Sequence, residues 1–94
     1  MEQDRIAIHL ALPRGGRGPG VLVLHPWWGL NQTVKSFCDR LAGEGFVALA
    51  PDLYRGELAT AIEDAERLSS ALDTERAKAD IAEAVGLLWK QAAR

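Results

Sequence analysis

The sequence contains very little cysteine and no long apolar run, and each absence excludes a class of protein. Cys38 is the single cysteine among 94 residues, so no disulfide can form within the chain, in agreement with a reducing compartment. Every apolar run is far shorter than the ~20 residues that a bilayer-spanning helix requires. The first ten residues, MEQDRIAIHL, carry acidic side chains where a secretory signal would carry basic ones. These absences predict a cytoplasmic protein that does not act at a membrane.

An excess of positive charge is missing as well. The 11 basic and 13 acidic residues give a formal net charge of −2 and are spread along the chain. No stripe of lysine and arginine suits a phosphate backbone, so nucleic acid is not an expected partner. The glycine-rich stretch 13–20, PRGGRGPG, precedes an apolar segment, whereas a dinucleotide-binding fingerprint follows a strand and opens a helix. We therefore expect a loop at this stretch, and neither a cofactor nor a bound metal ion in the chain.

Three short segments are typical of β-strands. Residues 21–24, VLVL, and 46–50, FVALA, are continuous apolar runs of the kind found in strands that are covered on both faces of a parallel sheet. Residues 5–12, RIAIHLAL, alternate with a period of two, which predicts a half-exposed strand at a sheet edge. Pro26 and Pro51 mark the carboxyl ends of the two buried strands.

A helix is predicted between the two buried strands. Asn31 or Thr33 can cap its first turn, and Gly43 and Gly45 end it. Its apolar residues recur at helical spacing, and they are Val34, Phe37, Cys38 and Leu41. Strand, helix and strand within about 30 residues form a βαβ unit, whose crossover is expected to be right-handed. This unit makes the chain an α/β protein.

Two more helices are predicted after Gly56. The first has Thr60 and Glu63 at the spacing of a capping box, and Asp73 is the expected cap of the second. The apolar stripe of the first helix consists of Leu58, Ile62, Ala65, Leu68 and Leu72. The stripe of the second consists of Ala77, Ile81, Ala84, Val85 and Leu88. The charged residues between positions 63 and 83 are expected on a solvated face.

The chain shows no change of composition that would divide it, so residues 1–94 are predicted to form one domain. A chain of this size buries only about 60–65% of its unfolded surface. A three-layer α/β architecture would therefore be marginal without a partner or more chain. The last predicted helix also reaches the end of the chain, where an alternating α/β pattern would continue with a strand. We expect an incomplete domain.

The polar and aromatic residues that follow the two buried strands form the candidate site. In open parallel sheets, ligands bind at the carboxyl ends of strands, where loops gather polar groups without disturbing the core. One such end carries HPWWG, residues 25–29, and the other carries PDLYRG, residues 51–56. Asp52 is expected to anchor its own turn by accepting backbone N–H groups. Alternatives stay open for several side chains. His25 orients the loop, lines the site or acts as a general base, and Arg55 is either solvated or contacts a substrate. Trp27 and Trp28 are either purely structural, or at least one of them lines a cleft or an interface.

These loops and the segments around them resemble the dienelactone hydrolase family of the α/β-hydrolase superfamily. The matching motifs are VLVLHPWWGLN, residues 21–31, the helix after it, GFVALAPDLYRG, residues 45–56, and the helical segment to Trp89. The resemblance runs from about Ile6 to the C-terminus, but it covers only the first half of a family member. It implies a partial α/β-hydrolase-like three-layer sandwich, with a mostly parallel sheet, flanking helices and a missing C-terminal half.

The same resemblance implies hydrolysis of lactones or related carboxylic esters by a nucleophile–histidine–aspartate triad, with the nucleophile usually a cysteine on a tight elbow. It places the backbone N–H of Trp27 in the oxyanion hole, which stabilises charge that develops only in the transition state. Tyr54 and Arg55 match a loop that can contact a substrate carboxylate in the family, a task that suits the paired donors of a guanidinium. His25 and Trp28 complete the predicted substrate-binding residues.

Two departures from the family pattern limit what the resemblance implies. Pro26 stands where founding members carry an acidic residue that contacts the nucleophile, so neither that control of the nucleophile nor dienelactone as the substrate is implied. No G-x-S-x-G or G-x-C-x-G occurs, and the family's triad would lie beyond Arg94. Cys38 lies on the apolar stripe of a predicted helix, where a thiol behaves as a small hydrophobe. The chain alone is therefore not expected to hydrolyse esters.

A second hypothesis, from a different functional class, is a non-catalytic α/β interaction module. In the superfamily the strand at 21–24 lies between the strand at 46–50 and the nucleophile strand. Without the nucleophile strand, an apolar central strand becomes a sheet edge, which invites pairing with another chain. This hypothesis predicts a homodimer through the unpaired edge, whereas the first predicts a small-molecule ester or lactone as the partner.

Overall fold

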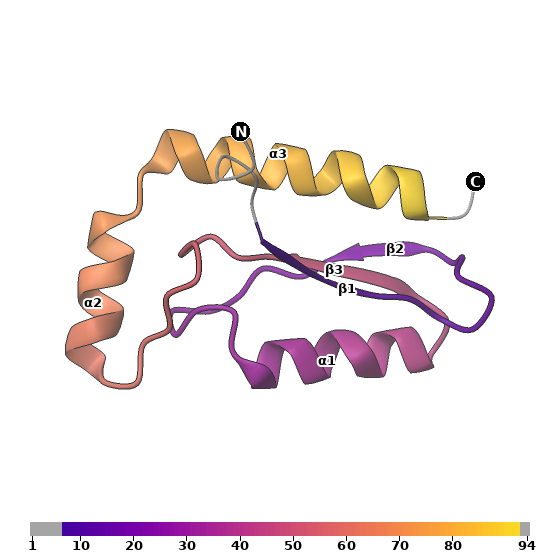
Figure 1. The fold of residues 1–94 in the computed structure, drawn as a ribbon, viewed down its shortest axis with the longest axis horizontal. Helices are drawn as coiled ribbons and strands as arrows, with labels where there is room; N and C mark the ends of the chain where they lie inside the picture. Colours follow the sequence, from indigo (N-terminus) through magenta and orange to yellow (C-terminus); the bar gives the residue numbers. More distant parts are fainter. Residues whose placement is uncertain (1–6, 93–94) are drawn as a thin grey trace.

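The central strand of the sheet is β3 (Val47–Pro51) in the computed structural model, which describes residues 7–92. In chain order the elements are β1 (Ile8–Ala11), β2 (Gly20–Leu22), α1 (Gln32–Gly43), β3, α2 (Ile62–Ala71) and α3 (Thr74–Gln91). α1 covers one face of the sheet and α3 covers the other, while α2 stands beyond the end of the sheet (Figure 1). The described part of the chain is thus a partial three-layer α/β fold, as predicted.

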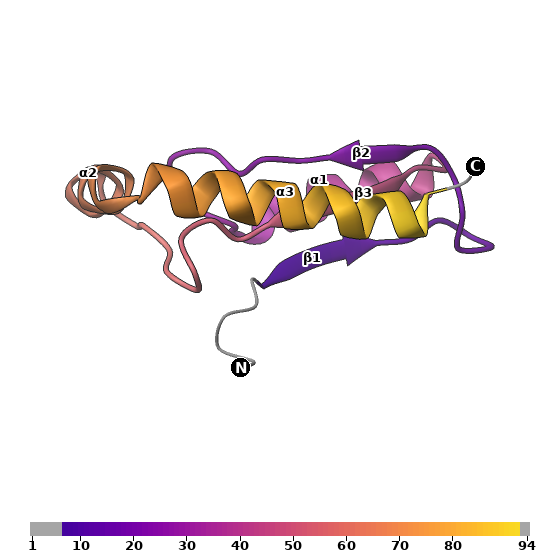
Figure 2. The same cartoon turned by 90° about the horizontal axis from the view of Figure 1, so that it is seen from above.

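β3 is paired along both of its edges (Figure 2). β1 runs antiparallel to it, with His9 opposite Ala50, and β2 runs parallel to it, with Val21 opposite Ala48. All five residues of β3 are buried, because helices cover both of its faces. The predicted doubly covered strand is confirmed, although it begins one residue later than expected and includes Pro51.

β2 is covered less than the sequence predicts. Its three residues are exposed or half-buried, and Leu24, just beyond it, is 50% exposed. The N–H of Val23 donates to the carbonyl of Leu49 at 2.9 Å, so the ladder continues one residue past the strand. Within residues 7–92, no strand pairs with its outer edge. Both faces of this segment still have apolar neighbours, because Val23 packs against the cluster that includes Val34 of α1 and Leu22 packs against the cluster that includes Ala84 of α3. The incomplete burial follows from the unpaired outer edge.

β1 forms the other edge of the sheet, as its alternating pattern predicts. Ile8 and Leu10 pack against the core cluster that includes Ala84 of α3. The opposite face carries His9, whose Nε2 lies 2.9 Å from the Asp39 Oδ1 of α1. Residues 5 and 6 of the predicted strand lie outside the described part of the chain.

Side chains cap two of the helices at the predicted places. Asn31 Oδ1 accepts the N–H of Val34 at 3.1 Å, so Asn31 rather than Thr33 is the cap of α1. Asp73 Oδ1 accepts two backbone N–H groups, at 3.0 and 3.2 Å, at the start of α3. Each cap satisfies donors that have no partner within the helix.

The capping box predicted at Thr60 and Glu63 is wrong. Ala61 is the N-cap of α2, and it makes no side-chain hydrogen bond. The N–H of Ala59 donates to the carbonyl of Trp28 at 3.0 Å. Because this bond holds the segment in an extended path beside the HPWWG loop, the helix begins one residue later than the box requires.

Helical spacing predicts the apolar stripes but overstates their burial. Cys38, Ala65 and Ala84 are fully buried, as expected. The stripe residues that are exposed are Phe37 (44%), Leu58 (52%), Ile62 (58%) and Val85 (37%). The apolar face of α2 packs against the loop residues Tyr54, Ala59 and Trp28, since the helix stands beyond the sheet. Within residues 7–92, no helix combines the length and the apolar character needed to cross a membrane.

Candidate functional site

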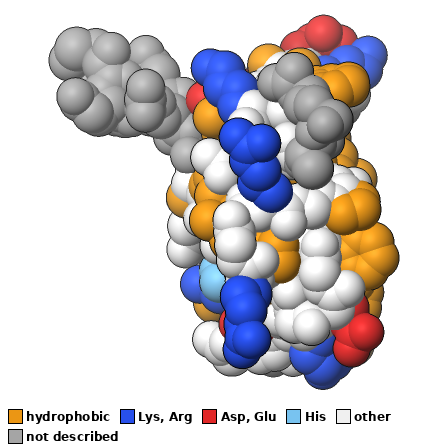
Figure 3. Space-filling view, turned by 90° about the vertical axis from the view of Figure 1, so that its right-hand side faces the viewer, with side chains coloured by type: hydrophobic (Ala, Val, Ile, Leu, Met, Phe, Trp, Pro, Cys, Tyr) orange, Lys and Arg blue, Asp and Glu red, His pale blue; other side chains and the backbone are white. Residues whose placement is uncertain are grey.

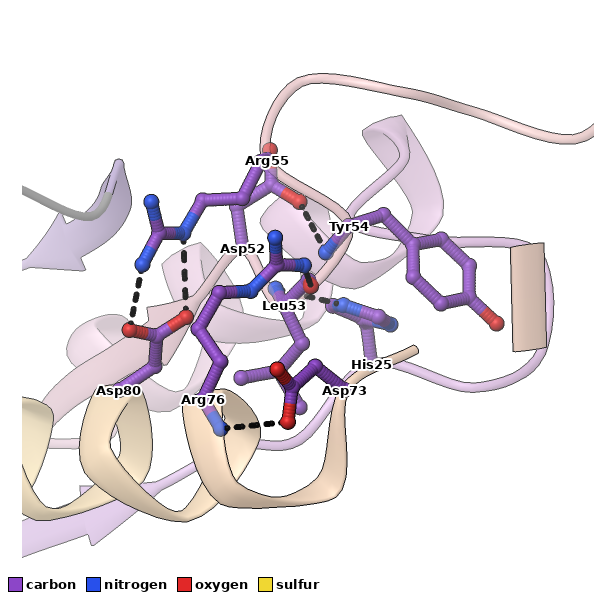
Figure 4. A network of polar contacts seen from close by, with 8 residues as sticks. All are labelled: His25, Asp52, Leu53, Tyr54, Arg55, Asp73, Arg76 and Asp80. Carbon is purple, nitrogen blue, oxygen red and sulfur yellow. Dashed lines mark hydrogen bonds and ion pairs between the residues drawn. The ribbon is translucent and has the colours of Figure 1, made fainter. Parts of the chain in front are cut away.

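The loops that follow β2 and β3 meet at the carboxyl end of the sheet, as the sequence predicts (Figure 4). The N–H of Leu53 donates to His25 Nε2 at 3.0 Å. The hydroxyl of Tyr54 donates to the carbonyl of Trp27 at 3.0 Å. The rings of His25 and Tyr54 have centroids 4.9 Å apart and are tilted by 58°. Three of the residues predicted for the site, His25, Trp27 and Tyr54, thus belong to one connected group, and Trp28 joins it as the fourth by an edge contact with the ring of Trp27.

The HPWWG loop folds into a tight turn. The N–H of Gly29 donates to the carbonyl of Pro26 at 3.0 Å, which places Trp27 and Trp28 at the two central positions. Neither tryptophan has a positive φ, as a type I turn requires, whereas Gly29 has a φ of 99°. Within residues 7–92, no acceptor is hydrogen-bonded to the backbone N–H of Trp27 or of Trp28. The turn therefore presents two consecutive N–H donors.

His25 orients this turn through both of its ring nitrogens. Because Nε2 accepts the N–H of Leu53, the proton of the neutral ring lies on Nδ1. Nδ1 lies 2.9 Å from the carbonyl oxygen of Pro26, to which it donates. The orienting role of His25 is therefore visible in the geometry, and its contact with a substrate stays a prediction.

Tyr54 is held as a neutral donor beneath the turn. Only 7% of its surface is exposed. Burial raises the pKa of its phenol above the ordinary value, so the hydroxyl keeps the proton that it donates to Trp27. Donation from this hydroxyl to a substrate would have to displace an existing hydrogen bond.

Asp52 anchors the loop after β3, as predicted. The residue is 7% exposed. Its Oδ1 accepts the N–H of Tyr54 at 3.1 Å, and its Oδ2 accepts the N–H of Gly56 at 2.8 Å. Both carboxylate oxygens are thus used to fix the backbone that carries Tyr54.

Arg55 is tied to a helix rather than solvated, so one of its two expected roles is wrong. Its Nε and Nη2 donate to Asp80 Oδ2 and Oδ1 at 3.1 and 2.7 Å, a paired contact with a side chain that is 5% exposed (Figure 4). Arg55 has a φ of 53°, a left-handed conformation that is unfavourable for a residue with a Cβ. The ion pair offsets this cost. Contact of Arg55 with a substrate carboxylate stays a prediction.

Asp80 is the residue that the sequence-based prediction missed. The sequence predicts a solvated face for the charged residues of positions 63–83, and this prediction is wrong for Asp80, which is 3% exposed. The signal was present, because Asp80 lies three residues after Ala77 and four before Ala84 and thus shares their buried helical face. A charged residue on an apolar stripe needs a buried partner, and only the tertiary structure identifies Arg55 as that partner.

The two tryptophans differ in exposure. Trp27 is 41% exposed, and its Nε1 donates to Ser69 Oγ of α2 at 3.0 Å. Trp28 is half-buried and packs with Tyr54 and Ala59. Their rings meet edge to face with centroids 5.8 Å apart. Ser69 was not predicted, since nothing in its sequence neighbourhood marks it as a partner of Trp27.

Cys38 is a core residue, as expected. It is 0% exposed, and burial, with a smaller contribution from Asp39, raises the pKa of its thiol. The thiolate that a nucleophile needs is therefore disfavoured. In the described part of the chain, no group of three or more histidine, cysteine, aspartate or glutamate side chains is placed to hold a metal ion.

Gly29 is expected to be essential for the turn. A Cβ at this position would lie 3.0 Å from the carbonyl oxygen of Glu57 and 3.2 Å from the Tyr54 ring, and the φ of 99° disfavours any side chain. Gly29→Ala should therefore lower the free energy of unfolding by about 2 kcal/mol, measured by urea denaturation.

Gly86→Ala is the matched control for Gly29→Ala. Gly86 lies inside α3, and an added Cβ would meet nothing within 4 Å. Alanine in a helix interior should raise the free energy of unfolding by about 0.5–1 kcal/mol. Equal effects of the two substitutions would show that the strain assigned to Gly29 is absent.

Comparison with known proteins gives consistent results. The sequence profile described as Dienelactone hydrolase family matches residues 6–93. The "Protein usf" of Aquifex pyrophilus is 51% identical over 63 residues, which are 64% of this chain and 27% of that protein. The carboxymethylenebutenolidase of Pseudomonas sp. (strain P51) is 48% identical over 50 residues, which are 53% of this chain and 21% of that protein.

The fold also matches a solved structure. A crystal structure from Klebsiella pneumoniae subsp. pneumoniae MGH 78578, named as a dienelactone hydrolase, superposes with a TM-score of 0.79 at 25% identity and covers 94% of this chain. The match covers 40% of that protein. The chain thus spans less than half the length of these relatives. Since a family profile covers nearly all of its residues, the chain belongs to the dienelactone hydrolase family.

Proposed function

We propose that this chain supplies the oxyanion-hole part of a dienelactone-hydrolase-like carboxylic ester or lactone hydrolase. The observation that supports the proposal is the backbone N–H of Trp27, which lies at the carboxyl end of β2 without an acceptor among residues 7–92. The nucleophile, the histidine and the aspartate of the triad would come from polypeptide that is not part of this chain. The expected site of action is the cytoplasm.

The chemistry assigned to Trp27 is electrostatic. When a nucleophile attacks an ester carbonyl, negative charge develops on the carbonyl oxygen. An N–H that is already aimed at this oxygen stabilises the transition state more than the ground state, since the charge is absent before attack. One such donor contributes about 2.7–4 kcal/mol to the barrier reduction. A second donor would come from the residue after the nucleophile.

The substrate proposed for this site is a small ester or lactone with a carboxylate. A hollow of about 190 Å³ beside the loop after β3 is lined by Tyr54, Arg55, Glu57 and Arg76, among others. Guanidinium groups recognise carboxylates through paired donors. The Nε and Nη2 groups of Arg55 donate to Asp80, so the ion pair fixes the position of the guanidinium beside this hollow. Tyr54 lines this hollow and is bonded to the turn through its hydroxyl, and His25 and Trp28 complete the proposed substrate-binding residues.

The proposal is tested by restoring the missing part of the fold. Arg94 is joined to the segment of the Klebsiella pneumoniae protein that follows its matched region, and hydrolysis of a small activated ester is compared for this chimera and for the 94-residue chain. We expect saturable hydrolysis by the chimera only. Saturable turnover by the chain alone would contradict the proposal, and so would a folded chimera without activity.

A second candidate function is a non-catalytic module that pairs through the outer edge of β2. The edge has no partner among the described strands, and Leu24 is 50% exposed. A hollow of about 250 Å³ lies beside it, lined by Gly20, Val85, Leu88, Trp89 and Ala92. Figure 3 shows hydrophobic side chains along one side of the molecule, and Figure 2 shows that β2 lies on this side. An unpaired apolar edge is a template for another strand.

The pairing hypothesis predicts a dimer that Leu24→Lys disrupts. A charge at this exposed position would meet its counterpart across the edge, so size-exclusion chromatography with light scattering should change from dimer to monomer. Leu12→Lys is the control, because Leu12 is similarly exposed (45%) but follows β1 at the opposite edge. A wild-type monomer at high concentration would rule out this function.

A further inference from the structure

We propose that His25 is a positioning residue that aims and strengthens the Trp27 N–H. The contacts form a chain of hydrogen bonds from the N–H of Leu53 through the ring of His25 to the carbonyl of Pro26, whose peptide unit carries the Trp27 N–H. The catalytic meaning of this relay depends on the function proposed above. The relay itself is a property of this chain and is measurable without catalysis.

The first step is the geometry of one peptide unit. The carbonyl of Pro26 and the N–H of Trp27 belong to the same amide, and no peptide bond among residues 7–92 is cis. In a trans amide the C=O and the N–H point in opposite directions. The carbonyl oxygen receives two donors, His25 Nδ1 at 2.9 Å and the N–H of Gly29 at 3.0 Å. These two bonds fix the direction in which the Trp27 N–H points.

The second step is polarisation. A hydrogen bond to a carbonyl draws electron density from the nitrogen of the same amide, so its N–H becomes a better donor. Successive bonds in such a chain strengthen one another by about 10–30% each. The Trp27 N–H is thus a stronger donor than an isolated amide, and it reaches this state before any ligand arrives.

The third step is the choice of the ring nitrogen that carries the imidazole proton. The ring can donate to Pro26 only if the proton is on Nδ1, and the N–H of Leu53 enforces this tautomer by occupying Nε2. Leu53 is 8% exposed and lies in the loop that Asp52 anchors. The orientation of the Trp27 amide is therefore set from the anchored loop that directly follows β3, the most buried strand.

Tyr54 acts on the next peptide unit in a parallel way. Its hydroxyl donates to the carbonyl of Trp27, and this carbonyl shares an amide with the N–H of Trp28. The two consecutive donors of the turn are thus aimed by different side chains. This separation allows the contribution of His25 to Trp27 to be measured while Trp28 serves as an internal reference.

Two substitutions separate the relay from a merely structural bridge. In His25→Asn the amide nitrogen is as many bonds from Cβ as Nδ1, so it can donate to Pro26, but the bond from Leu53 is lost. In His25→Gln the amide oxygen is as many bonds from Cβ as Nε2, so it can accept from Leu53, but the bond to Pro26 is lost. A purely structural bridge between the loops depends on the bond from Leu53 to His25 and not on the bond from His25 to Pro26.

The test is nuclear magnetic resonance of the ¹⁵N-labelled 94-residue chain at a pH where an ordinary imidazole is neutral. We expect the His25 ring nitrogens to report a protonated Nδ1 and an unprotonated Nε2. The Trp27 amide proton should move upfield in His25→Gln and stay near its wild-type position in His25→Asn. The Trp28 amide and the amides of β3 should stay in place in His25→Gln, as the control for folding.

Three results would overturn the proposal. The first is a His25 ring protonated on Nε2 in the wild-type chain, and the second is a Trp27 amide proton that does not shift in His25→Gln. The third is a Trp27 amide proton that shifts more in His25→Asn than in His25→Gln. The wild-type tautomer decides the matter even if a variant fails to fold. Failure of the proposed function appears elsewhere, as an inactive chimera, so the two failures are distinguishable.

Discussion

Trp27→Pro is expected to lower the kcat for ester hydrolysis by a factor of about 10²–10³ in the chimera that contains this chain. Proline removes the one backbone N–H assigned to the oxyanion hole. The backbone should tolerate it, because Trp27 occupies the first central position of a turn with a negative φ, where the fixed φ of proline fits. The loss should appear in kcat with little change in KM, since the bond forms only in the transition state.

Trp27→Ala is the matched control for this effect. It removes the indole and its bond from Nε1 to Ser69 but keeps the N–H. Its kcat should therefore stay much closer to the wild-type value than that of Trp27→Pro. If the two variants lost the same activity while retaining wild-type unfolding midpoints, the indole rather than the amide would be the functional group.

Arg55→Ala is expected to lower the free energy of unfolding by about 3 kcal/mol. The substitution leaves the Asp80 carboxylate, which is 5% exposed, without its charged partner. This value is at the lower end for broken buried pairs, because the Arg55 side chain is 27% exposed and part of its charge is already screened by water. Asp80→Ala should lower the free energy of unfolding by less than Arg55→Ala does, since the longer arginine side chain can extend its charged end into solvent.

A double-mutant cycle in urea denaturation measures this coupling. If the pair accounts for the loss, removing both side chains should cost less than the sum of the two single effects. Arg67→Ala is the control, because Arg67 lies 3.7 Å from Glu57 with both side chains 60% exposed, and such pairs contribute about 0.2–1 kcal/mol at most. A cost for Arg55→Ala as small as that for Arg67→Ala would refute the assigned role of the buried pair.

The sequence predicts the order and type of the elements because local chemistry determines them. Asn31 and Asp73 cap helices through their own neighbouring N–H groups, and Asp52 anchors a turn within four residues of itself. These contacts depend on short stretches of chain. They are therefore readable from residue types and spacing alone.

The parts that the sequence does not predict depend on tertiary approach. The bond between Leu53 and His25 spans 28 positions, and that between Tyr54 and Trp27 spans 27. Neither residue type marks its partner. Burial is misjudged for a related reason, because helical spacing identifies the apolar face of Ile62 but not whether another element covers it. The sequence predicts that the loops after β2 and β3 lie together, but it does not predict the hydrogen bonds that join them or the partners Asp80 and Ser69.

The position of β3 has a consequence for which parts of the site open to solvent most readily. Its edges are both paired and its faces both covered, so its amides are freed only when the whole sheet opens. α2 packs against a few loop residues beyond the sheet, and its local opening costs far less. The Trp27 N–H is aligned through Leu53, in the loop that follows β3 and that Asp52 anchors, but the Trp27 indole is held by Ser69 of α2. Opening of α2 can therefore release the indole while the backbone donor keeps its direction, which uncouples access to the site from the alignment of its donor.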